Sequence, residues 1–423
     1  MLYSEMTKEQ LASERIALEK EYAAYKEKGL KLDMSRGKPA PAQLDLTMGM
    51  MDGLGGDYRT DGGVDCRNYG LLDGIPEAKR LFADMLGVQP ENVIVGGSSS
   101  LQLMYDTVIR ALQLGVLGGK PWSECGGVKF LCPVPGYDRH FAICQALGIG
   151  MVNVPLGKDG PDMDEVERLV SSDESIKGIW CVPMYSNPTG LTYSDETVRR
   201  FAALKPAAAD FRIFWDNAYC VHHLSEDCDT LLNIIDECAK AGNPDMVFEF
   251  ASTSKISFPG SGVAVIAASE ANIDFIKSQM TFQTIGFDKL NQLRHVRFFK
   301  DMDGIRAQMK RHAQIIRPKF EAVLDILERE ITPVGAGRWA KPKGGYFISF
   351  DAPKGTAKRI VGLAKDAGVV MTGAGATYPY GLDPNDSNIR IAPTYPTVDE
   401  LRTAMEIFCV CVRLAAVEGL LAD

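Results

Sequence analysis

The chain lacks the features that would direct it into or across a membrane. No run in its 423 residues approaches the roughly 20 consecutive apolar residues that a membrane-spanning helix requires. Residues 1–5 do not place a basic segment before an apolar core, so we expect no signal peptide. On these grounds we expect a cytoplasmic protein.

An excess of positive charge is also missing. Lys and Arg number 46 against 55 Asp and Glu, and the formal net charge of -9 argues against a nucleic-acid or anionic-membrane partner. The ten cysteines are scattered without a CxxC or Cys/His spacing, which indicates no metal site and favours a reducing compartment. The composition, 46% hydrophobic and 24% charged, is that of a soluble globular chain with material for two domains.

Short apolar runs alternate with helical stretches such as 101–112 and 163–170 from about residue 90 onward. The runs predict strands at 93–95, 128–132, 151–154, 179–182, 211–215, 246–250 and 263–267. This alternation is typical of an α/β fold with a mostly parallel central sheet and helices on both faces. A ligand of such a sheet binds beyond the carboxyl ends of the strands.

The strand pattern weakens after about residue 290. A long helical segment is predicted from 287 to about 327, followed by strands at 344–350 and 389–393 and a helix from Thr397. We interpret this region as a smaller α+β domain.

The predicted division of the chain has three parts. Residues 51–295 form a large domain, residues 296–423 form the small one, and residues 1–50 join the small domain as a helix and an extended segment. The helix begins behind a capping box at Thr7. Its apolar face could pack on the chain's own core or on a partner subunit, and it carries Leu11, Leu18, Tyr22 and Tyr25.

Lys255 is the first candidate for chemistry, because it lies among small hydroxyl residues between the predicted strands 246–250 and 263–267. A lysine in that place would be buried, and burial favours the neutral, nucleophilic amine. Such an amine can form a Schiff base with an aldehyde cofactor. A loop lysine that points to solvent is the alternative that this stretch leaves open.

Three further candidates follow strands of the same predicted sheet. The turn 96–100 is rich in glycine and serine and begins a helix, so its amides could hold a phosphate, although it lacks both the GxGxxG spacing and a P-loop lysine. Asn187 follows strand 179–182. Asp216 ends strand 211–215, where a carboxylate needs a cationic partner such as a protonated pyridine nitrogen. The combination indicates pyridoxal phosphate.

These residues resemble the fold-type I pyridoxal-phosphate aminotransferases, and more closely an aspartate aminotransferase subgroup that carries the motifs SRGKPAP and STSK. The likeness covers essentially the whole chain. In order along the sequence it rests on Asn68-Tyr69, Asp73-Gly74-Ile75-Pro76-Glu77, Asn187-Pro188-Thr189-Gly190, Asp216-Asn217-Ala218-Tyr219, Ser252-x-Ser254-Lys255 and Arg390.

The resemblance implies a role for each residue around the cofactor ring. Lys255 would form the Schiff base and then act as the general acid and base. Asp216 would pair with the pyridinium nitrogen and His140 would support Asp216 from behind. Tyr137 would stack on the ring, while Asn187 and Tyr219 would donate to its phenolate oxygen.

The resemblance also implies which residues would bind the cofactor phosphate and the substrate carboxylate. Tyr69 would reach the phosphate of the neighbouring subunit's site, which requires a homodimer. Arg390 would bind the substrate α-carboxylate as a bidentate pair, with Asn187 and the backbone of Gly37 beside it. Gly97, Ser98, Ser99 and Ser252 would hold the phosphate, and Ser254 would also belong to the cofactor site.

Two departures from the family pattern stand out. Many relatives have an arginine about eight residues after the lysine, but the segment 260–263 has none. The phosphate must then rely on amides and hydroxyls, or on another cation such as Arg139. No motif identifies the arginine for a second substrate carboxylate, and Arg36, Lys38 and Arg139 are the candidates.

The function that the resemblance implies is a ping-pong transamination between aspartate and 2-oxoglutarate. Other enzymes of the same fold remain as alternatives, namely an aromatic or kynurenine-type aminotransferase or a β-lyase. A pyridoxal-phosphate-binding regulatory module is the non-enzymatic alternative. The net acidity and the lack of a DNA-binding region ahead of Ser35 argue against it.

Overall fold

A seven-stranded sheet is the centre of the computed structural model, which describes residues 1–422. The strands follow the order β2-β8-β7-β6-β5-β3-β4, and all neighbours are parallel except that β8 runs antiparallel to both β2 and β7. Their bounds are Val93–Val95 (β2), Lys129–Val134 (β3), Gly150–Pro155 (β4), Ile176–Cys181 (β5), Arg212–Asp216 (β6), Val247–Ser252 (β7) and Ala264–Ala267 (β8). The predicted α/β class and all seven predicted strands are confirmed.

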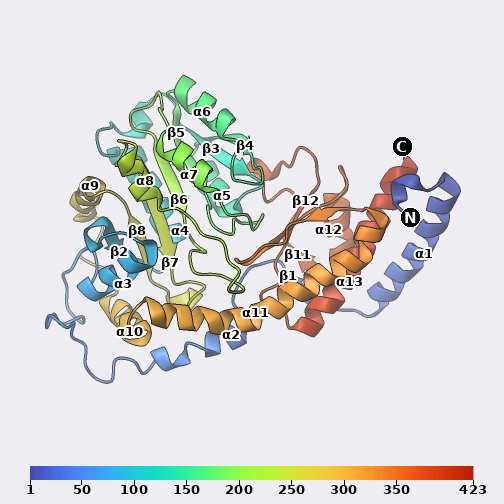
Figure 1. The fold of residues 1–423 in the computed structure, drawn as a ribbon, viewed down its shortest axis with the longest axis horizontal. Helices are drawn as coiled ribbons and strands as arrows, with labels where there is room; N and C mark the ends of the chain where they lie inside the picture. The colour runs from blue at the N-terminus through green and yellow to red at the C-terminus, as the bar shows by residue number, and fades with distance from the viewer. Residues whose placement is uncertain (423) are drawn as a thin grey trace.

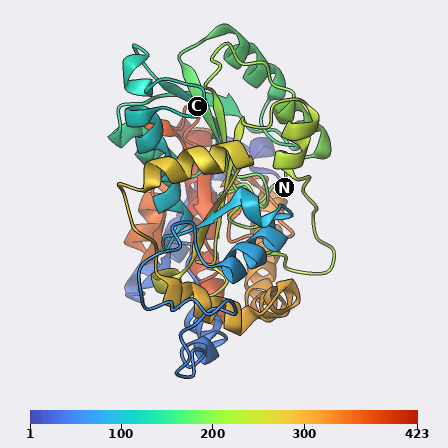
Figure 2. The same ribbon diagram turned by 90° about the vertical axis from the view of Figure 1, so that its left-hand side faces the viewer.

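Helices cover both faces of this sheet (Figures 1 and 2). The helices are α3 (Pro76–Leu86), α4 (Ser100–Leu114), α5 (Asp138–Ala146), α6 (Met163–Ser172), α7 (Asp195–Ala202), α8 (Ile234–Lys240), α9 (Glu270–Met280) and α10 (Lys289–Phe299). Successive strand residues point to opposite faces, so Ile213 packs with α3, α6, α7 and α8, while Phe214 packs with α4, α5 and α9. Burial on both faces explains why these strands are apolar along their whole length.

A smaller lobe lies beside the sheet. It contains an antiparallel sheet of β9 (Arg338–Trp339), β10 (Ile348–Asp351) and β12 (Asn388–Ile391), and a parallel pair of β1 (Leu32–Met34) with β11 (Val369–Met371). Its helices are α12 (Ala357–Asp366) and α13 (Val398–Ala422). The long helix α11 (Met302–Glu330) joins the lobes, because Ile305 and Met309 pack in the core of the large lobe and Phe320 packs in that of the small one. Short 3-10 helices lie at Tyr3–Glu5, Met48–Met50, Pro90–Asn92, Trp122–Glu124, Pro259–Ser261, Thr332–Val334 and Pro379–Gly381.

The N-terminal helix α1 (Lys8–Glu27) packs against α13, as Figure 1 shows. Thr7 caps it in the predicted capping box. Leu11 and Leu18 are buried, and the Tyr22 hydroxyl donates to the carbonyl of Leu363 at 2.9 Å. Of the two outcomes expected for this helical face, the structure shows packing on the chain's own core.

The prediction of one long helix from 287 to about 327 is wrong. The chain breaks between α10 and α11 at Lys300, which has a left-handed φ of 68°. Asp301 caps the new helix, because its Oδ1 accepts from the backbone N–H of Gly304 at 3.0 Å. A capping aspartate offers the backbone an alternative to continuing the helix, which periodicity alone does not reveal.

The segment that follows β1 crosses from one lobe to the other and includes α2 (Pro41–Asp45). Gln43 is fully buried and donates to the hydroxyl of Tyr346 at 2.9 Å. The hydroxyl of Thr372 donates to the carbonyl of Ser35 at 2.6 Å. These contacts hold the segment 35–43 where the lobes meet. The division at residues 50/51 and 295/296 stays a prediction.

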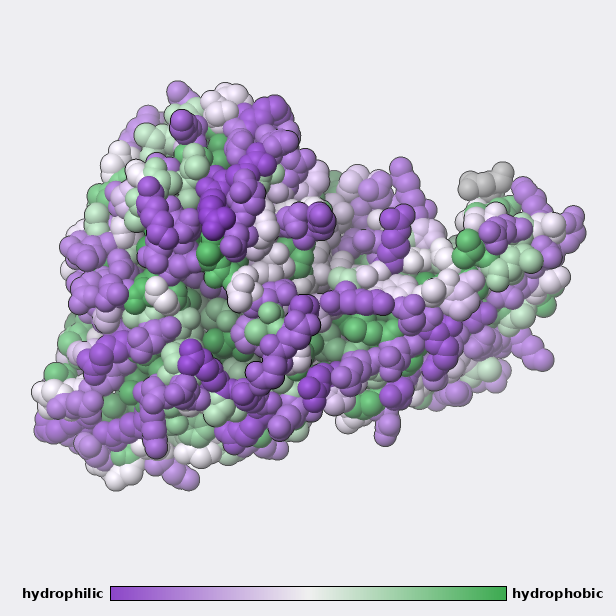
Figure 3. All heavy atoms as spheres, in the orientation of Figure 1, coloured by the Kyte–Doolittle hydropathy of each residue, from purple (hydrophilic) through white to green (hydrophobic). Residues whose placement is uncertain are grey.

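The side of the molecule shown in Figure 3 is mostly hydrophilic, with hydrophobic patches that include the hollow between the lobes. Among the helices of residues 1–422, none combines the length and hydrophobicity required to span a bilayer.

Candidate active site

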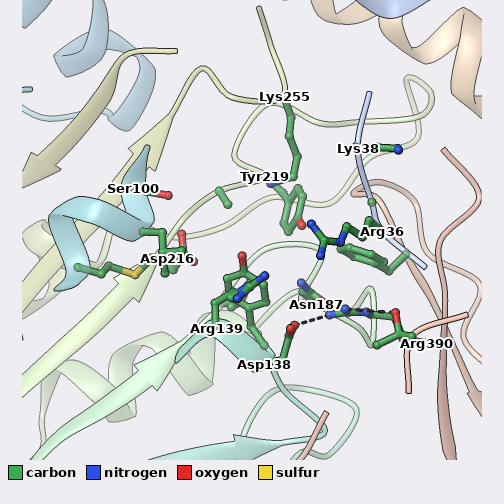
Figure 4. A pocket seen from close by; sticks show the side chains of 18 of the residues that line it. Arg36, Lys38, Ser100, Asp138, Arg139, Asn187, Asp216, Tyr219, Lys255 and Arg390 are labelled. Atoms are coloured by element: carbon green, nitrogen blue, oxygen red, sulfur yellow. Dashed lines mark hydrogen bonds and ion pairs between the residues drawn. The ribbon is translucent and has the colours of Figure 1, made fainter. Parts of the chain in front are cut away.

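A cavity of about 500 Å³ lies between the two lobes, beyond the carboxyl ends of β5 and β6 (Figure 4). Its position is the one that parallel sheets offer to ligands. The large lobe lines it with Ser100, Leu101, Met104, Tyr137, Asp138, Arg139, Val182, Asn187, Asp216, Ala218, Tyr219 and Lys255. The small lobe and the N-terminal segment contribute Ser35, Arg36, Gly37, Lys38, Phe347, Thr372 and Arg390.

Lys255 lies inside the cavity, three residues beyond the end of β7. Its Nζ is 4.9 Å from the ring centroid of Tyr219 and 5.8 Å from that of Tyr346. Burial lowers the pKa of the Lys255 amine, and the carboxylate of Asp216 partly opposes that shift. Of the two readings of this lysine, the structure shows the interior one. A lowered pKa increases the share of neutral amine, which is the nucleophilic form.

Helix α10 contacts the loop that carries Lys255 (residues 253–258, here called the Lys255 loop) through His295. The hydroxyls of Ser257 and Thr253 lie 2.8 and 3.1 Å from Nε2 of His295. The other ring nitrogen, Nδ1, lies 2.8 Å from the carbonyl oxygen of Asn291, which can only accept, so Nδ1 carries the proton. Burial lowers the pKa of His295 to about 4, so the ring is neutral and Nε2 accepts from the hydroxyls. No sequence motif pointed to this support.

Asp216 is buried at the end of β6 and faces α5. Its Oδ2 lies 3.0 Å from Nε2 of His140, and the His140 ring stacks on Trp180 with centroids 4.4 Å apart. The ring of Tyr137 meets His140 edge-on at 4.9 Å. Within residues 1–422, Oδ1 of Asp216 has no hydrogen-bond partner although it is buried. A buried carboxylate oxygen without a partner is costly, which indicates a ligand donor at this point.

The turn before α4 provides backbone donors at the start of a helix. Gly97 has a left-handed φ of 73°, and the Ser99 side chain caps α4 by accepting from the N–H of Gln102. Across the turn, a Cβ at Gly262 would lie only 2.8 Å from the carbonyl oxygen of Ser98, so the two loops approach each other closely. Free amides at a helix N-terminus suit a phosphate.

The end of β7 and the residues that follow it provide two hydroxyls, those of Ser252 and Ser254. The Oγ atoms of Ser252 and Ser254 are 3.0 Å apart. Ser100, the last residue of the predicted phosphate turn 96–100, lines the cavity. In the segment without the family arginine, the Ser261 hydroxyl accepts from Arg294 of α10. A cation therefore stands next to that segment, although it comes from a distant part of the sequence.

Arg390 is the buried cation of the cavity, with 7% of its surface exposed. Its Nη1 donates to Oδ1 of Asp138 at 2.8 Å and to Oδ1 of Asn187 at 3.2 Å. Its guanidinium lies over the ring of Phe347 at 4.9 Å. Because the amide oxygen of Asn187 accepts from Arg390, its Nδ2 is left to donate to a ligand. Sequence reasoning missed Asp138 and Phe347, which no motif marks.

Three further cations lie at the cavity: Arg36, Lys38 and Arg139. The Lys38 Nζ lies over the ring of Tyr395 at 3.7 Å and 3.9 Å from a carboxylate oxygen of Asp33. Arg36 and Arg139 are exposed, and within the described chain neither side chain forms an ion pair or a hydrogen bond. These two guanidinium groups are therefore available to an anionic ligand.

Gly37 and Tyr69 are the last two predicted site residues, and only Gly37 lies at the cavity. Gly37 lines the cavity, and a side chain there would collide with the ring of Phe347. Tyr69 lies outside the cavity and is 80% exposed. It borders a separate shallow depression together with Phe287. An exposed side chain is compatible with a role in a neighbouring subunit, and the structure does not bring Tyr69 to the cavity of its own chain.

The residues of the cavity fit pyridoxal phosphate. The partnerless Oδ1 of Asp216 can accept from a protonated ring nitrogen, and the Lys255 amine is poised to react with an aldehyde. Tyr137 offers an aromatic face, and the turn before α4 offers amides for a phosphate.

Comparisons with known proteins agree with this chemistry. A family model described as aspartate aminotransferase matches residues 6–423. A protein of Mycolicibacterium smegmatis, provisionally named an aminotransferase, is 49% identical over 427 residues and 100% of both chains. An aspartate aminotransferase of Corynebacterium glutamicum is 44% identical over 413 residues, 96% of this chain and 95% of its own. A crystal structure of an aspartate transaminase from C. glutamicum has a TM-score of 0.96 at 42% identity over 99% of each chain.

The fold and the cavity thus define an aminotransferase of fold type I, which uses pyridoxal phosphate. Within that class, the chain belongs to the aspartate aminotransferase family, whose model matches nearly its full length. The resemblance stated from the motifs is confirmed.

We predict that Asp216→Ala weakens cofactor binding by at least about tenfold, because a buried charge-assisted hydrogen bond contributes roughly 1.5–3 kcal/mol. His140→Ala should weaken it less, since Asp216 keeps its charge. Fluorescence titration of the apoenzyme with pyridoxal phosphate measures both. Asp173→Ala is the matched control, because Asp173 pairs with Lys129 outside the cavity. Wild-type affinity in Asp216→Ala would contradict the assignment.

Proposed function

We propose that this aminotransferase exchanges the amino group of aspartate with 2-oxoglutarate by a ping-pong mechanism. The observation that supports the proposal most is the excess of cations in the cavity. Arg36, Lys38, Arg139 and Arg390 line it against the carboxylates of Asp138 and Asp216. Aspartate and 2-oxoglutarate each carry two carboxylates, whereas an aromatic substrate offers no second one. The 44% identical aspartate aminotransferase of C. glutamicum adds support.

When bound, pyridoxal phosphate supplies an electron sink for negative charge at the substrate Cα. Lys255 would remove the proton from that Cα with its neutral amine and later return it. Asp216 would hold the proton of the ring nitrogen, with His140 fixing the carboxylate. Asn187 and Tyr219 would donate to the phenolate oxygen. Arg390 would bind the α-carboxylate in a water-poor site.

For the phosphate, we propose the backbone and hydroxyl donors of two loops and a hydroxyl of a second subunit. The residues are Gly97, Ser98, Ser99, Ser252, Ser254 and the partner's Tyr69. Tyr137 would stack on the ring. Gly37 would bring its backbone near the substrate carboxylate, since it already lies against Phe347.

We further propose that Arg139 binds the second carboxylate of the substrate. Lys38 is already engaged by Tyr395 and Asp33. Arg36 belongs to the extended segment between β1 and α2. Arg139 is the second residue of α5, next to the Asp138 that contacts Arg390, so a helix fixes its backbone.

We predict that Arg139→Gln lowers kcat/KM for aspartate by about tenfold to a hundredfold, the loss expected for one charged hydrogen-bonded contact. The value for alanine should change little, since alanine has no second carboxylate. Arg36→Gln is the comparison variant and should lower kcat/KM for aspartate less. Steady-state assays with both amino acids measure the ratio. An unchanged ratio in Arg139→Gln together with a lost preference in Arg36→Gln would assign the contact to Arg36 instead.

We also propose a homodimer with shared active sites. Large apolar side chains are exposed on two neighbouring segments, and they include Met48, Met51, Tyr69, Phe282 and Ile285. The two segments, 48–70 and 282–294, touch each other. The Met51 sulfur lies 3.9 Å from Nη1 of Arg294, and Gly286 lies against Gly70. Figure 2 shows both on the side turned toward the viewer. Contiguous exposed apolar surface marks an interface.

We predict that mixing two inactive variants, Tyr69→Ala and Lys255→Ala, restores activity. A mixed dimer contains one site with both Lys255 and Tyr69, supplied by different subunits. The mixture is denatured and refolded together, and transaminase activity is compared with that of each variant refolded alone. Absence of any gain, with mixed dimers verified by native mass spectrometry, would rule out a shared site.

Finally, we propose a cytoplasmic location. All ten cysteines are free thiols in the structure, and a chain with that many unpaired thiols suits a reducing compartment.

A further inference from the structure

Arg390 is already paired with a carboxylate of its own chain. Nη1 donates to Oδ1 of Asp138 at 2.8 Å, and the pair joins β12 of the small lobe to the first residue of α5 (Figure 4). The Asp138 side chain is 30% exposed and the Arg390 side chain only 7%. Nothing in the transamination chemistry described above requires this contact.

The donors that remain on Arg390 are limited. Its Nε is buried and has no acceptor within residues 1–422. Nη2 donates to the hydroxyl of Thr372 at the long distance of 3.3 Å. A carboxylate that binds end-on to the guanidinium as a bidentate pair takes Nη1 and Nη2. Nη1 is the nitrogen that Asp138 holds.

We propose that Asp138 competes with the substrate α-carboxylate for Arg390 and so weakens the binding of every substrate of the enzyme. The inference rests on the proposed function only in assigning the α-carboxylate to Arg390. Two carboxylates on one guanidinium repel each other and share its donors, so a substrate must displace Asp138 or bind beside it. In both cases the loss of binding free energy is the same for an amino acid and for an oxo acid, and it does not depend on whether the ligand has one carboxylate or two.

This competition has a use in a ping-pong enzyme. Each turnover releases an oxo acid and an amino acid from the same site, and a competing carboxylate assists both departures. Uniform weakening of binding raises KM without changing the choice between substrates. Asp138 thus sets how tightly the enzyme binds all of its substrates, whereas Arg139 is proposed to favour substrates that carry two carboxylates.

The alternative is that Asp138 only orients the guanidinium of Arg390. Other residues already hold that guanidinium in place. Phe347 lies against the face of the guanidinium, Asn187 accepts from Nη1 and Thr372 accepts from Nη2. Asparagine at position 138 keeps an oxygen that can accept from Nη1 and removes only the charge. The Asp138→Asn variant therefore separates competition from positioning.

The experiment uses the pyridoxal-phosphate-loaded enzyme and two unreactive ligands, succinate with two carboxylates and propionate with one. Isothermal titration calorimetry gives Kd for each. In Asp138→Asn we expect Kd to fall about tenfold for both ligands, which corresponds to about 1.4 kcal/mol. KM for both substrates should fall by a similar factor, and kcat should not rise. Asp173→Asn, with the same charge change at the surface pair with Lys129, should leave every Kd unchanged.

An unchanged or increased Kd for succinate would overturn the proposal, because it would show that Asp138 only orients Arg390. Tighter succinate with unchanged propionate would also overturn it, since Asp138 would then act on the second carboxylate. If circular dichroism shows that Asp138→Asn does not fold, Asp138→Ser removes the same charge and is held to the same criteria. Failure of the aspartate assignment would alter the Arg139 result and leave the propionate result intact.

Discussion

The active site depends on a lysine amine kept inside the protein without a full countercharge. The Lys255 amine lies beside the neighbouring rings of Tyr219 and Tyr346, and burial lowers the pKa of this amine although Asp216 opposes the shift. The carboxylate of Asp216 is itself turned to His140 and keeps one oxygen without a protein partner. The amine and the carboxylate line the same cavity, and we propose that each serves one end of the cofactor.

That arrangement requires both lobes of the chain. The ends of β5, β6 and β7 supply Asn187, Asp216 and Lys255, whereas Arg390 comes from β12 of the small lobe. The guanidinium of Arg390 donates directly to Asn187, so the proposed substrate site and the proposed cofactor site share a hydrogen bond. This hydrogen bond crosses the boundary between the lobes.

The residues at strand ends could be predicted from the sequence because their position follows from the fold. Apolar runs mark the strands, and parallel strands bring their carboxyl ends to one edge, which placed Asp216 and Lys255 together. Asp138 and His295 could not be found in this way, because each acts through a partner that is distant in the sequence, namely Arg390 and the Lys255 loop. Periodicity also missed the break at Lys300, which depends on a local capping contact rather than on hydrophobic pattern.

The central claim is that the Lys255 amine, and no other lysine, bonds covalently to the cofactor aldehyde. Borohydride reduction of the enzyme supplied with pyridoxal phosphate, followed by protease digestion and mass spectrometry of the peptides, tests it directly. The account predicts one phosphopyridoxyl group, located on the peptide that contains Lys255. A stable label on a different lysine, or unlabelled Lys255 in enzyme that transaminates, would contradict it.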